Sequence, residues 1–319
     1  MSARRSTRVA DPLPRVLPPG RSLTVRAVDG TPLHTEVFGP PDGLPIVLTH
    51  GITCSIRAWT YQIAELATEY RVIAFDHRGH GRSGVPRRCA YSLKHLASDL
   101  DCVLEATVAP HERAVLAGHS MGGITIAAWS ARYRHKVHRR VNAVALINTT
   151  TGEVARRVQL LSVPGPISPA RVLAARGLVS AFAGLPIPAA ALLATRSLVA
   201  MLAVGKEADP STAKLIYELF AQTSPAGRGG CARMLVESLG ARYLDLSGLT
   251  VPTLVIGSMN DRLTPLRQAR EIARTAPNVV ALVELPGGHC SMLEYPHEVN
   301  RQLRLLAESV TLHVEPISS

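Results

Sequence analysis

Short apolar runs alternate along most of the chain with longer segments whose apolar residues recur at helical spacing. The short runs predict buried strands, and the longer segments predict helices that cover a sheet. Strands are predicted over residues 22–28, 33–38, 46–49, 71–75, 114–117, 143–147, 253–256 and 279–285, and helices over 59–68, 93–108, 122–133, 265–275 and 296–309. Asp29-Gly30 separates the first two strands and predicts a hairpin between them.

The alternation stops between residues 151 and 245, where the sequence is helical in pattern, apolar and rich in Ala, Leu and Pro. The predicted fold class is α/β, with a mostly parallel, doubly wound sheet and a helical cap inserted after the sixth strand. We expect a flexible N-terminal arm over residues 1–20, a core over 21–150 and 246–312, and the cap, or lid, over 151–245.

No charged residue occurs between residues 177 and 195, so this stretch approaches the length of a membrane span. Gly184, Pro186 and Pro188 interrupt it, and Arg176 and Arg196 bracket it. This arrangement favours two short apolar helices joined by a turn. Contact of these helices with a membrane surface stays open.

A candidate nucleophile lies in Gly118-His119-Ser120-Met121-Gly122, which fits G-x-S-x-G between a predicted strand and a predicted helix. A serine in such a tight turn is held clear of the sheet, at the N-terminal end of the following helix. The free N–H groups and the positive dipole end of that helix can stabilise a developing anion. An ordinary glycine turn would give the same short pattern, so the flanking elements carry the interpretation.

A serine hydroxyl needs a base, and His289 is the candidate because it follows Pro286-Gly287-Gly288 directly after the last strand. Asp261 follows the strand at 253–256 and is the candidate acid that accepts the imidazole N–H. The chain order Ser, Asp, His is the one expected for this fold. Three rivals for the acid are weaker: Asp245 precedes its strand, Asn148 carries no charge, and Asp76 is better suited to hold a turn.

Two backbone N–H groups are candidates for an oxyanion hole. Gly51 follows the third strand, and it leaves room for the N–H of Ile52 to point at a substrate. The N–H of Met121, directly after the nucleophile, would complete the pair.

These motifs make the sequence resemble the α/β-hydrolase superfamily, and specifically serine hydrolases of the esterase and lipase type. The matching pieces extend over about residues 22–310: His50-Gly51, the segment 76–83, Gly118 to Gly123, Asn260-Asp261 and Gly288-His289. The resemblance implies that residues 76–83 form a structural turn beside the active site and that 151–245 cover the nucleophile. Ser120 argues against relatives with an Asp nucleophile, such as epoxide hydrolases and haloalkane dehalogenases.

Composition adds limits on partners and location. The formal charge is +11, but the Arg residues are scattered and aromatics are only 4%, so nucleic-acid binding is not expected. The densest basic patch, residues 132–140, is interpreted as solvated surface. The five Cys show no CxxC spacing, which indicates neither a disulfide framework nor a zinc site and fits the cytoplasm. No metal or cofactor is expected.

The apolar cap is the only clue to the substrate, and it favours a small-molecule carboxylic ester with an apolar or lipid-like acyl group. Peripheral membrane contact through the cap is an associated expectation. Other serine-triad activities of the superfamily remain as alternatives: carbon–carbon bond hydrolase, thioesterase and cofactor-free haloperoxidase. A ligand-binding member without turnover is the alternative outside enzymes. The oligomeric state is not predicted.

Overall fold

A computed structural model of the protein describes residues 17–87, 90–152, 185, 189–239 and 243–311. Within these residues, eight strands form one sheet: β1 (Gly20–Arg26), β2 (Pro32–Phe38), β3 (Pro45–Thr49), β4 (Arg71–Phe75), β5 (Ala114–His119), β6 (Val141–Ile147), β7 (Thr253–Ser258) and β8 (Val279–Leu285). Each strand overlaps a predicted run. The predicted arm lies largely outside the described residues, and the residue limits predicted for arm, core and cap stay predictions.

The strands follow the spatial order β1-β2-β4-β3-β5-β6-β7-β8. β2 runs antiparallel to both β1 and β4, and all other neighbouring strands are parallel. The carboxyl ends of β3, β5, β6, β7 and β8 therefore meet at one edge of the sheet. Ligands of open α/β sheets bind at this edge.

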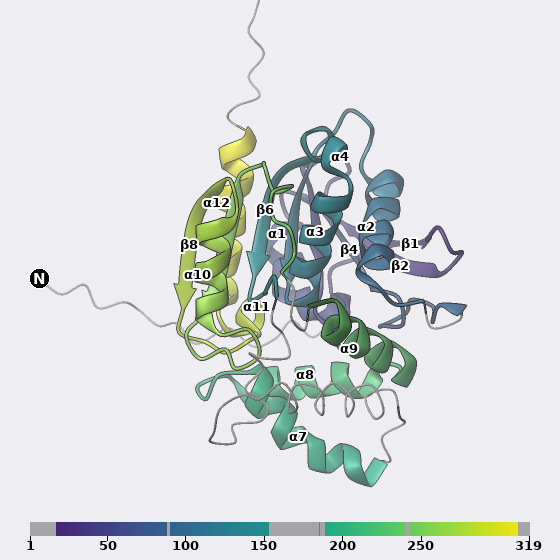
Figure 1. Cartoon of the computed structure of the whole chain (residues 1–319), viewed down its shortest axis with the longest axis vertical. Coiled ribbons are helices and arrows are strands. Elements are labelled where there is room, and N and C mark those ends of the chain that lie inside the picture. The colour runs from purple at the N-terminus through teal and green to yellow at the C-terminus, as the bar shows by residue number, and fades with distance from the viewer. Residues whose placement is uncertain (1–16, 88–89, 153–184, 186–188, 240–242, 312–319) are drawn as a thin grey trace, which may run out of the picture.

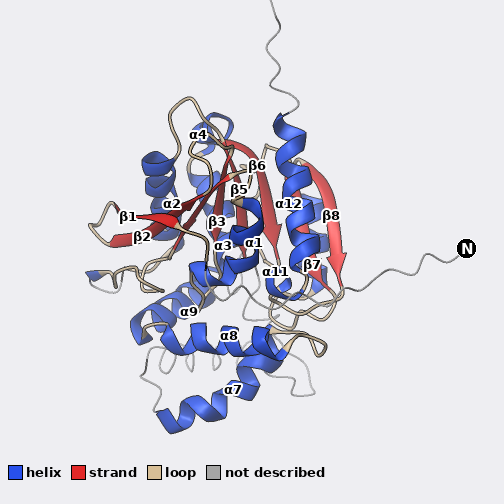
Figure 2. Ribbon diagram, turned by 180° about the vertical axis from the view of Figure 1, so that it is seen from behind, coloured by secondary structure: helices blue, strands red, loops and turns tan. Residues whose placement is uncertain are grey.

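Helices cover both faces of the sheet (Figures 1 and 2). One face carries the 3-10 helix η1 (Ile56–Trp59), α1 (Thr60–Leu66), α11 (Ser291–Glu294) and α12 (Pro296–Thr311). The other carries α2 (Leu93–Thr107), α3 (Met121–Arg132), α4 (Arg134–Arg140) and α10 (Leu266–Thr275). This covering explains why the strands are apolar at consecutive positions rather than at alternate ones.

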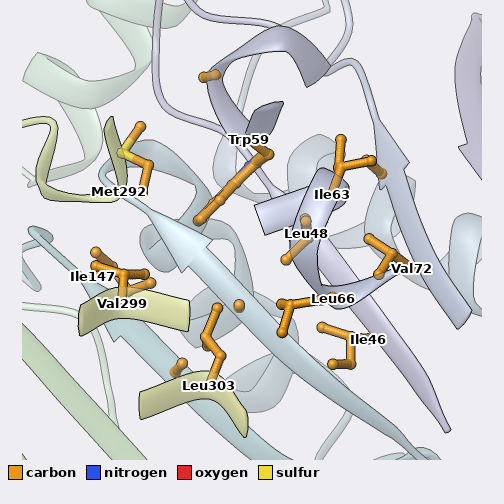
Figure 3. Packing of buried hydrophobic residues seen from close by; sticks show 14 of the residues in the cluster. Ile46, Leu48, Trp59, Ile63, Leu66, Val72, Ile147, Met292, Val299 and Leu303 are labelled. Carbon is orange, nitrogen blue, oxygen red and sulfur yellow. The ribbon is translucent and has the colours of Figure 1, made fainter. Parts of the chain in front are cut away.

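Each face of the sheet has its own apolar core. In β3, Leu48 packs on the side of α1 and α12, whereas its neighbour Val47 packs on the side of α2 and α3. Figure 3 shows the first of these cores, where side chains from η1, α1 and α12 surround the central strands. The residues labelled there are Ile46, Leu48, Trp59, Ile63, Leu66, Val72, Ile147, Met292, Val299 and Leu303.

Local sequence signals account for several element ends. Ser92 caps α2, and its hydroxyl accepts a hydrogen bond from the N–H of His95. Gly30 has φ +81°, so the Asp29-Gly30 turn adopts a backbone conformation that favours glycine. The hairpin of β1 and β2 is therefore confirmed.

Three helices of the cap are described: α7 (Ala189–Ala203), α8 (Pro210–Gln222) and α9 (Pro225–Leu239). They lie beyond the carboxyl ends of the strands (Figure 1). The cap follows β6 and precedes β7, as predicted. Its two ends are adjacent, because Gly152 and Tyr243 form an antiparallel bridge and the N–H of Leu244 donates to the carbonyl of Thr151 at 2.6 Å.

Helix α9 approaches the core through glycines. A Cβ added at Gly227 would overlap the carbonyl of Gly79, and one added at Gly230 would overlap the ring of Tyr91. The hydroxyl of Ser224, just before α9, donates to the carbonyl of Gly79 at 2.8 Å. The missing side chains thus allow the helix to lie directly on the core.

The apolar stretch at residues 177–195 lies mostly outside the described residues, so the two predicted short helices are not tested there. None of the helices in the described part of the chain combines the length and apolar character needed to cross a bilayer. Helix α7 exposes Leu198 and Met201. Membrane contact through the cap stays a prediction.

The prediction that residues 132–140 form a solvated patch is wrong for Arg140. Its guanidinium is buried and donates to the carbonyls of Leu104, Val108 and Ala109 at 2.8–3.1 Å. These carbonyls lie at and just beyond the C-terminal end of α2, where the last carbonyls of a helix have few helical donors; those of Leu104 and Ala109 also accept the N–H groups of Val108 and Glu112. Arg140 therefore completes a helix end, a role that depends on a contact between distant segments.

Candidate active site

Ser120 lies in a strained turn between β5 and α3, with φ 53° and ψ −117°. A non-glycine residue adopts this conformation only when its surroundings impose it. Here the close packing of two glycines does so: a Cβ on Gly118 would lie 2.6 Å from the carbonyl carbon of Gly122, and a Cβ on Gly122 would overlap the carbonyl of Thr49. The geometry is that of a nucleophile elbow.

The loop after β3 lies directly against this turn. A Cβ on Gly51 would be 3.1 Å from the Cβ of Ser120, so a larger residue at position 51 would press on the nucleophile. In the described part of the chain, no hydrogen-bond acceptor faces the N–H of Ile52. The N–H of Met121 opens helix α3, where the first N–H groups have no acceptor within the helix.

Asp261 and His289 are buried side by side, and His289 Nδ1–H donates to Asp261 Oδ2 at 2.8 Å. The backbone N–H groups of Leu263 and Thr264 donate to Asp261 Oδ1, each at 2.8 Å, and the Thr264 hydroxyl donates to Oδ2 at 2.7 Å. Burial raises the pKa of Asp261, but His289 and the Thr264 donors outweigh burial and hold this pKa below its ordinary value. The carboxylate is therefore ionised and fixes the His289 tautomer.

Contacts of the His119 side chain join the loop of His289 to the turn that holds Ser120. The ring of His119 lies 4.7 Å from that of His289, and His119 Nε2–H donates to the carbonyl of His289 at 2.8 Å. Among the described residues, no hydrogen bond links the hydroxyl of Ser120 to His289. Such bonds are often long without substrate and tighten during reaction, so the arrangement remains compatible with proton transfer from Ser120 to His289 Nε2.

Asn148 is a site residue whose role the sequence did not reveal. It directly follows β6 and has φ 43°, and its Nδ2–H donates to Asp261 Oδ2 at 2.9 Å. The hydroxyls of Ser258 and Ser291 donate to Asn148 Oδ1 at 3.4 and 2.5 Å, which fixes the amide orientation. Sequence reasoning rejected Asn148 because it lacks charge. Its place at the carboxyl end of a parallel strand was the available signal.

The other rivals for the acid are accounted for. Asp76 holds a turn, as predicted: its two carboxylate oxygens accept hydrogen bonds from the N–H groups of Ile56 and Arg82, each at 2.8 Å. Asp245 is exposed and pairs with Arg134. Neither carboxylate contacts His289.

Four histidines beside the site are fully buried and held neutral. Burial lowers the pKa of His77 and His119 to about 3, that of His80 to about 4, and that of His50 well below its ordinary value. His50 Nδ1–H donates to the carbonyl of Gly51, while His50 Nε2 accepts from the N–H of His77. His50 and His77 therefore hold the loop after β3 in place. No cluster of His, Cys, Asp or Glu suited to a metal ion occurs within the described ranges.

Comparisons with known proteins give one consistent result. The family model of the alpha/beta hydrolase fold matches residues 45–296. RutD of Variovorax paradoxus, provisionally named a carbamate hydrolase, is 30% identical over 280 residues, which cover 85% of this chain and 94% of the relative.

Two solved structures match nearly the whole chain. An enol-lactonase from Burkholderia xenovorans is 25% identical with a TM-score of 0.70, covering 90% of this chain and 100% of that one. A thermophilic esterase from Thermogutta terrifontis is 25% identical with a TM-score of 0.74, covering 91% of this chain and 99% of that one.

Proposed function

The chain belongs to the alpha/beta hydrolase fold family, and on this premise we propose that it is a serine hydrolase that cleaves carboxylic esters through an acyl-enzyme on Ser120. The observation that carries the proposal is the buried Asp261–His289 pair beside a strained serine turn. A strained serine turn and an oriented imidazole at the same sheet edge are what acyl transfer requires.

The proposed cycle has two halves. Ser120 Oγ attacks the ester carbonyl while His289 Nε2 takes the hydroxyl proton, and Asp261 stabilises the imidazolium. The N–H groups of Ile52 and Met121 bind the oxyanion. The alcohol leaves with the proton from His289. A water molecule then attacks the acyl-enzyme with His289 as base, and the carboxylic acid departs as His289 returns the proton to Ser120 Oγ.

Apolar side chains packed next to the proposed nucleophile support an apolar acyl group. Ile52 and Met121 pack in one cluster with Cys231, Met234 and Leu235 of the cap helix α9. The side chains beside both proposed oxyanion donors are therefore apolar. Such walls favour an alkyl or aryl acyl chain over a sugar or peptide. The names of the two solved structures, an esterase and a lactonase, also favour ester bonds.

A carbamate is the second candidate substrate, because RutD carries the name of a carbamate hydrolase and aligns over nearly its whole length. The same serine, base and oxyanion donors would serve, since a carbamate also presents a carbonyl with a leaving group. The two candidate substrates differ in the group attached to the carbonyl carbon, which is a carbon chain in an ester of an apolar acid and a nitrogen in a carbamate.

The decisive experiment compares the wild type with Ser120→Ala on p-nitrophenyl esters of rising chain length and on matched carbamates. We expect Ser120→Ala to stay folded and lose turnover by about 10³-fold or more. Wild-type kcat/KM should rise from acetate to longer acyl chains. Ser130→Ala, a buried serine later in α3, is the control for folding.

Unchanged hydrolysis by Ser120→Ala would refute the nucleophile. A sharp preference for acetate would refute the apolar acyl pocket, and faster turnover of carbamates would select the second candidate. Labelling by a fluorophosphonate probe separates an enzyme from a binding protein, since only an activated serine reacts.

A further inference from the structure

The end of cap helix α7 is fastened to the two loops that carry Asp261 and His289. Arg262, next to Asp261, donates to the carbonyl of Met201 at 3.2 Å. The N–H of Cys290, next to His289, donates to the carbonyl of Ala203 at 3.1 Å. Both acceptors lie in the last turn of α7. The cap thus contacts the immediate neighbours of both proposed triad members.

One carboxylate joins the cap to the base loop directly. Glu294 Oε2 accepts the N–H of Gly205, just beyond α7, at 2.8 Å and the N–H of Gly288, just before His289, at 2.9 Å. We call this group of contacts, formed by Glu294, Gly205 and Gly288, the cap clasp.

The two glycines of the clasp touch each other. A Cβ on Gly288 would overlap the backbone nitrogen of Gly205, and a Cβ on Gly205 would lie 3.1 Å from the nitrogen of Gly288. Neither glycine has a positive φ. These positions therefore need glycine for the close approach of two backbones, not for a special turn. A substitution at either glycine would separate the cap from the base loop.

Glu294 holds this position at a cost. Burial raises the pKa of Glu294 above its ordinary value, which means that its charged form is disfavoured there. Its second oxygen, Oε1, is buried and has no hydrogen-bond partner among the described residues. A partly buried carboxylate with one buried, unused oxygen is a costly way to join two loops. Unsatisfied buried polar atoms of this kind are common at sites where the position of a side chain matters for function.

We propose that Glu294 is a positioning residue that sets the place of the His289 imidazole according to how the cap sits on the core. The inference rests on the proposed function, because it assigns His289 as base. A cap seated on substrate holds Gly205 against Gly288, and the Glu294 carboxylate then fixes the residue before His289. Displacement of the cap releases the base loop and withdraws the base from Ser120.

The test uses Glu294→Ala and Glu294→Gln in the full chain, with Glu298→Gln on α12 as the charge-matched control. The alanine removes the acceptor, whereas the glutamine keeps a carbonyl oxygen for both N–H groups. We expect Glu294→Ala to lower kcat on the order of ten- to a hundredfold, with KM changed far less, and to slow fluorophosphonate labelling of Ser120 in parallel. Glu294→Gln should recover most of the rate, and Glu298→Gln should match the wild type.

Wild-type labelling and kcat in a folded Glu294→Ala protein would overturn the proposal, even if its melting temperature falls. If Glu294→Ala does not fold, Gly205→Ala decides, because its added Cβ would lie 2.8 Å from Glu294 Oε2. Slower labelling in Gly205→Ala supports the clasp, and unchanged labelling refutes it. Activity that survives Ser120→Ala refutes the proposed function instead, so the two failures are distinguishable.

Discussion

The side-chain amide of Asn148, beside Asp261, limits the negative charge near His289. Asn148 presents its Nδ2–H to Asp261 because two serine hydroxyls occupy its oxygen. The carboxylate thereby receives a donor without a second charge. His289 then faces one negative group rather than two. The residue rejected as an acid is thus one of the donors that orient Asp261, together with Leu263, Thr264 and His289.

Asn148→Asp should move the acidic limb of the kcat/KM pH profile upward. A carboxylate at position 148 would stand as close to Asp261 as the amide does now, so the two groups would titrate as a coupled pair. Their added negative charge favours the imidazolium, and the active form should therefore be lost at a higher pH. The measurement is kcat/KM on an activated ester between pH 5 and 9. Asn142→Asp, at the other end of β6, is the control and should keep the wild-type profile. Superimposable profiles for Asn148→Asp would contradict the role given to Asn148.

At the scale of elements, the seating of α9 on the core depends on missing side chains. Gly230→Ala should destabilise the protein by about 1–3 kcal/mol, because the new methyl group overlaps the ring of Tyr91. Alanine favours a helix over glycine by about 1 kcal/mol, which works in the opposite direction. Thermal unfolding provides the measurement, and a higher melting temperature would mean that α9 does not lie directly on the core.

The sequence predicted the strands, the flanking helices and the place of the cap because each element repeats its own hydrophobic period. It also predicted that Ser120, Asp261 and His289 lie at one edge of the sheet, since the carboxyl ends of parallel strands all point to the same edge. It placed Asn148 at the same sheet edge without giving its role, and it could not reveal Arg140 or the cap clasp. Their roles come from contacts between segments far apart in the chain, and no local pattern encodes such contacts.

Gly288 illustrates the limit. The sequence showed it only as part of Pro286-Gly287-Gly288, the segment between the last strand and His289. The structure gives it an ordinary φ and places Gly205 of the cap where its side chain would be. The residue type was informative, but the physical reason for it lay in a partner 83 positions earlier in the chain.

For the whole molecule, the buried histidines make folding sensitive to acid. Their pKa values lie below the ordinary value of 6.5, at about 3 for His77 and about 4 for His80. Between pH 6.5 and these values the unfolded chain binds protons that the folded chain does not. The stability they contribute is complete above pH 6.5 and is lost as the pH falls toward 3–4. Asp99, whose pKa burial raises to about 6, works in the opposite direction below that pH.

His80→Gln removes one of these titrations. The slope of the unfolding free energy against pH should fall by up to about 1.4 kcal/mol per pH unit between pH 6.5 and 4, whatever the variant's stability at neutral pH. Urea unfolding at pH 4.5, 5.5 and 7.5 measures this slope. His111→Gln, at an exposed position, is the control. An unchanged slope in His80→Gln would show that His80 is not held neutral.

The bridge between Gly152 and Tyr243 makes the cap an insertion that could be exchanged as a unit. Because the first and last residues of the cap are adjacent, any segment that joins them leaves the ends of β6 and β7 unchanged. The entropic cost of closing such a segment into a loop grows only slowly with its length. Evolution can thus replace or lengthen the cap without moving the residues at the sheet edge. Each new cap would still need a backbone N–H at the position where Gly205 now contacts Glu294 and Gly288.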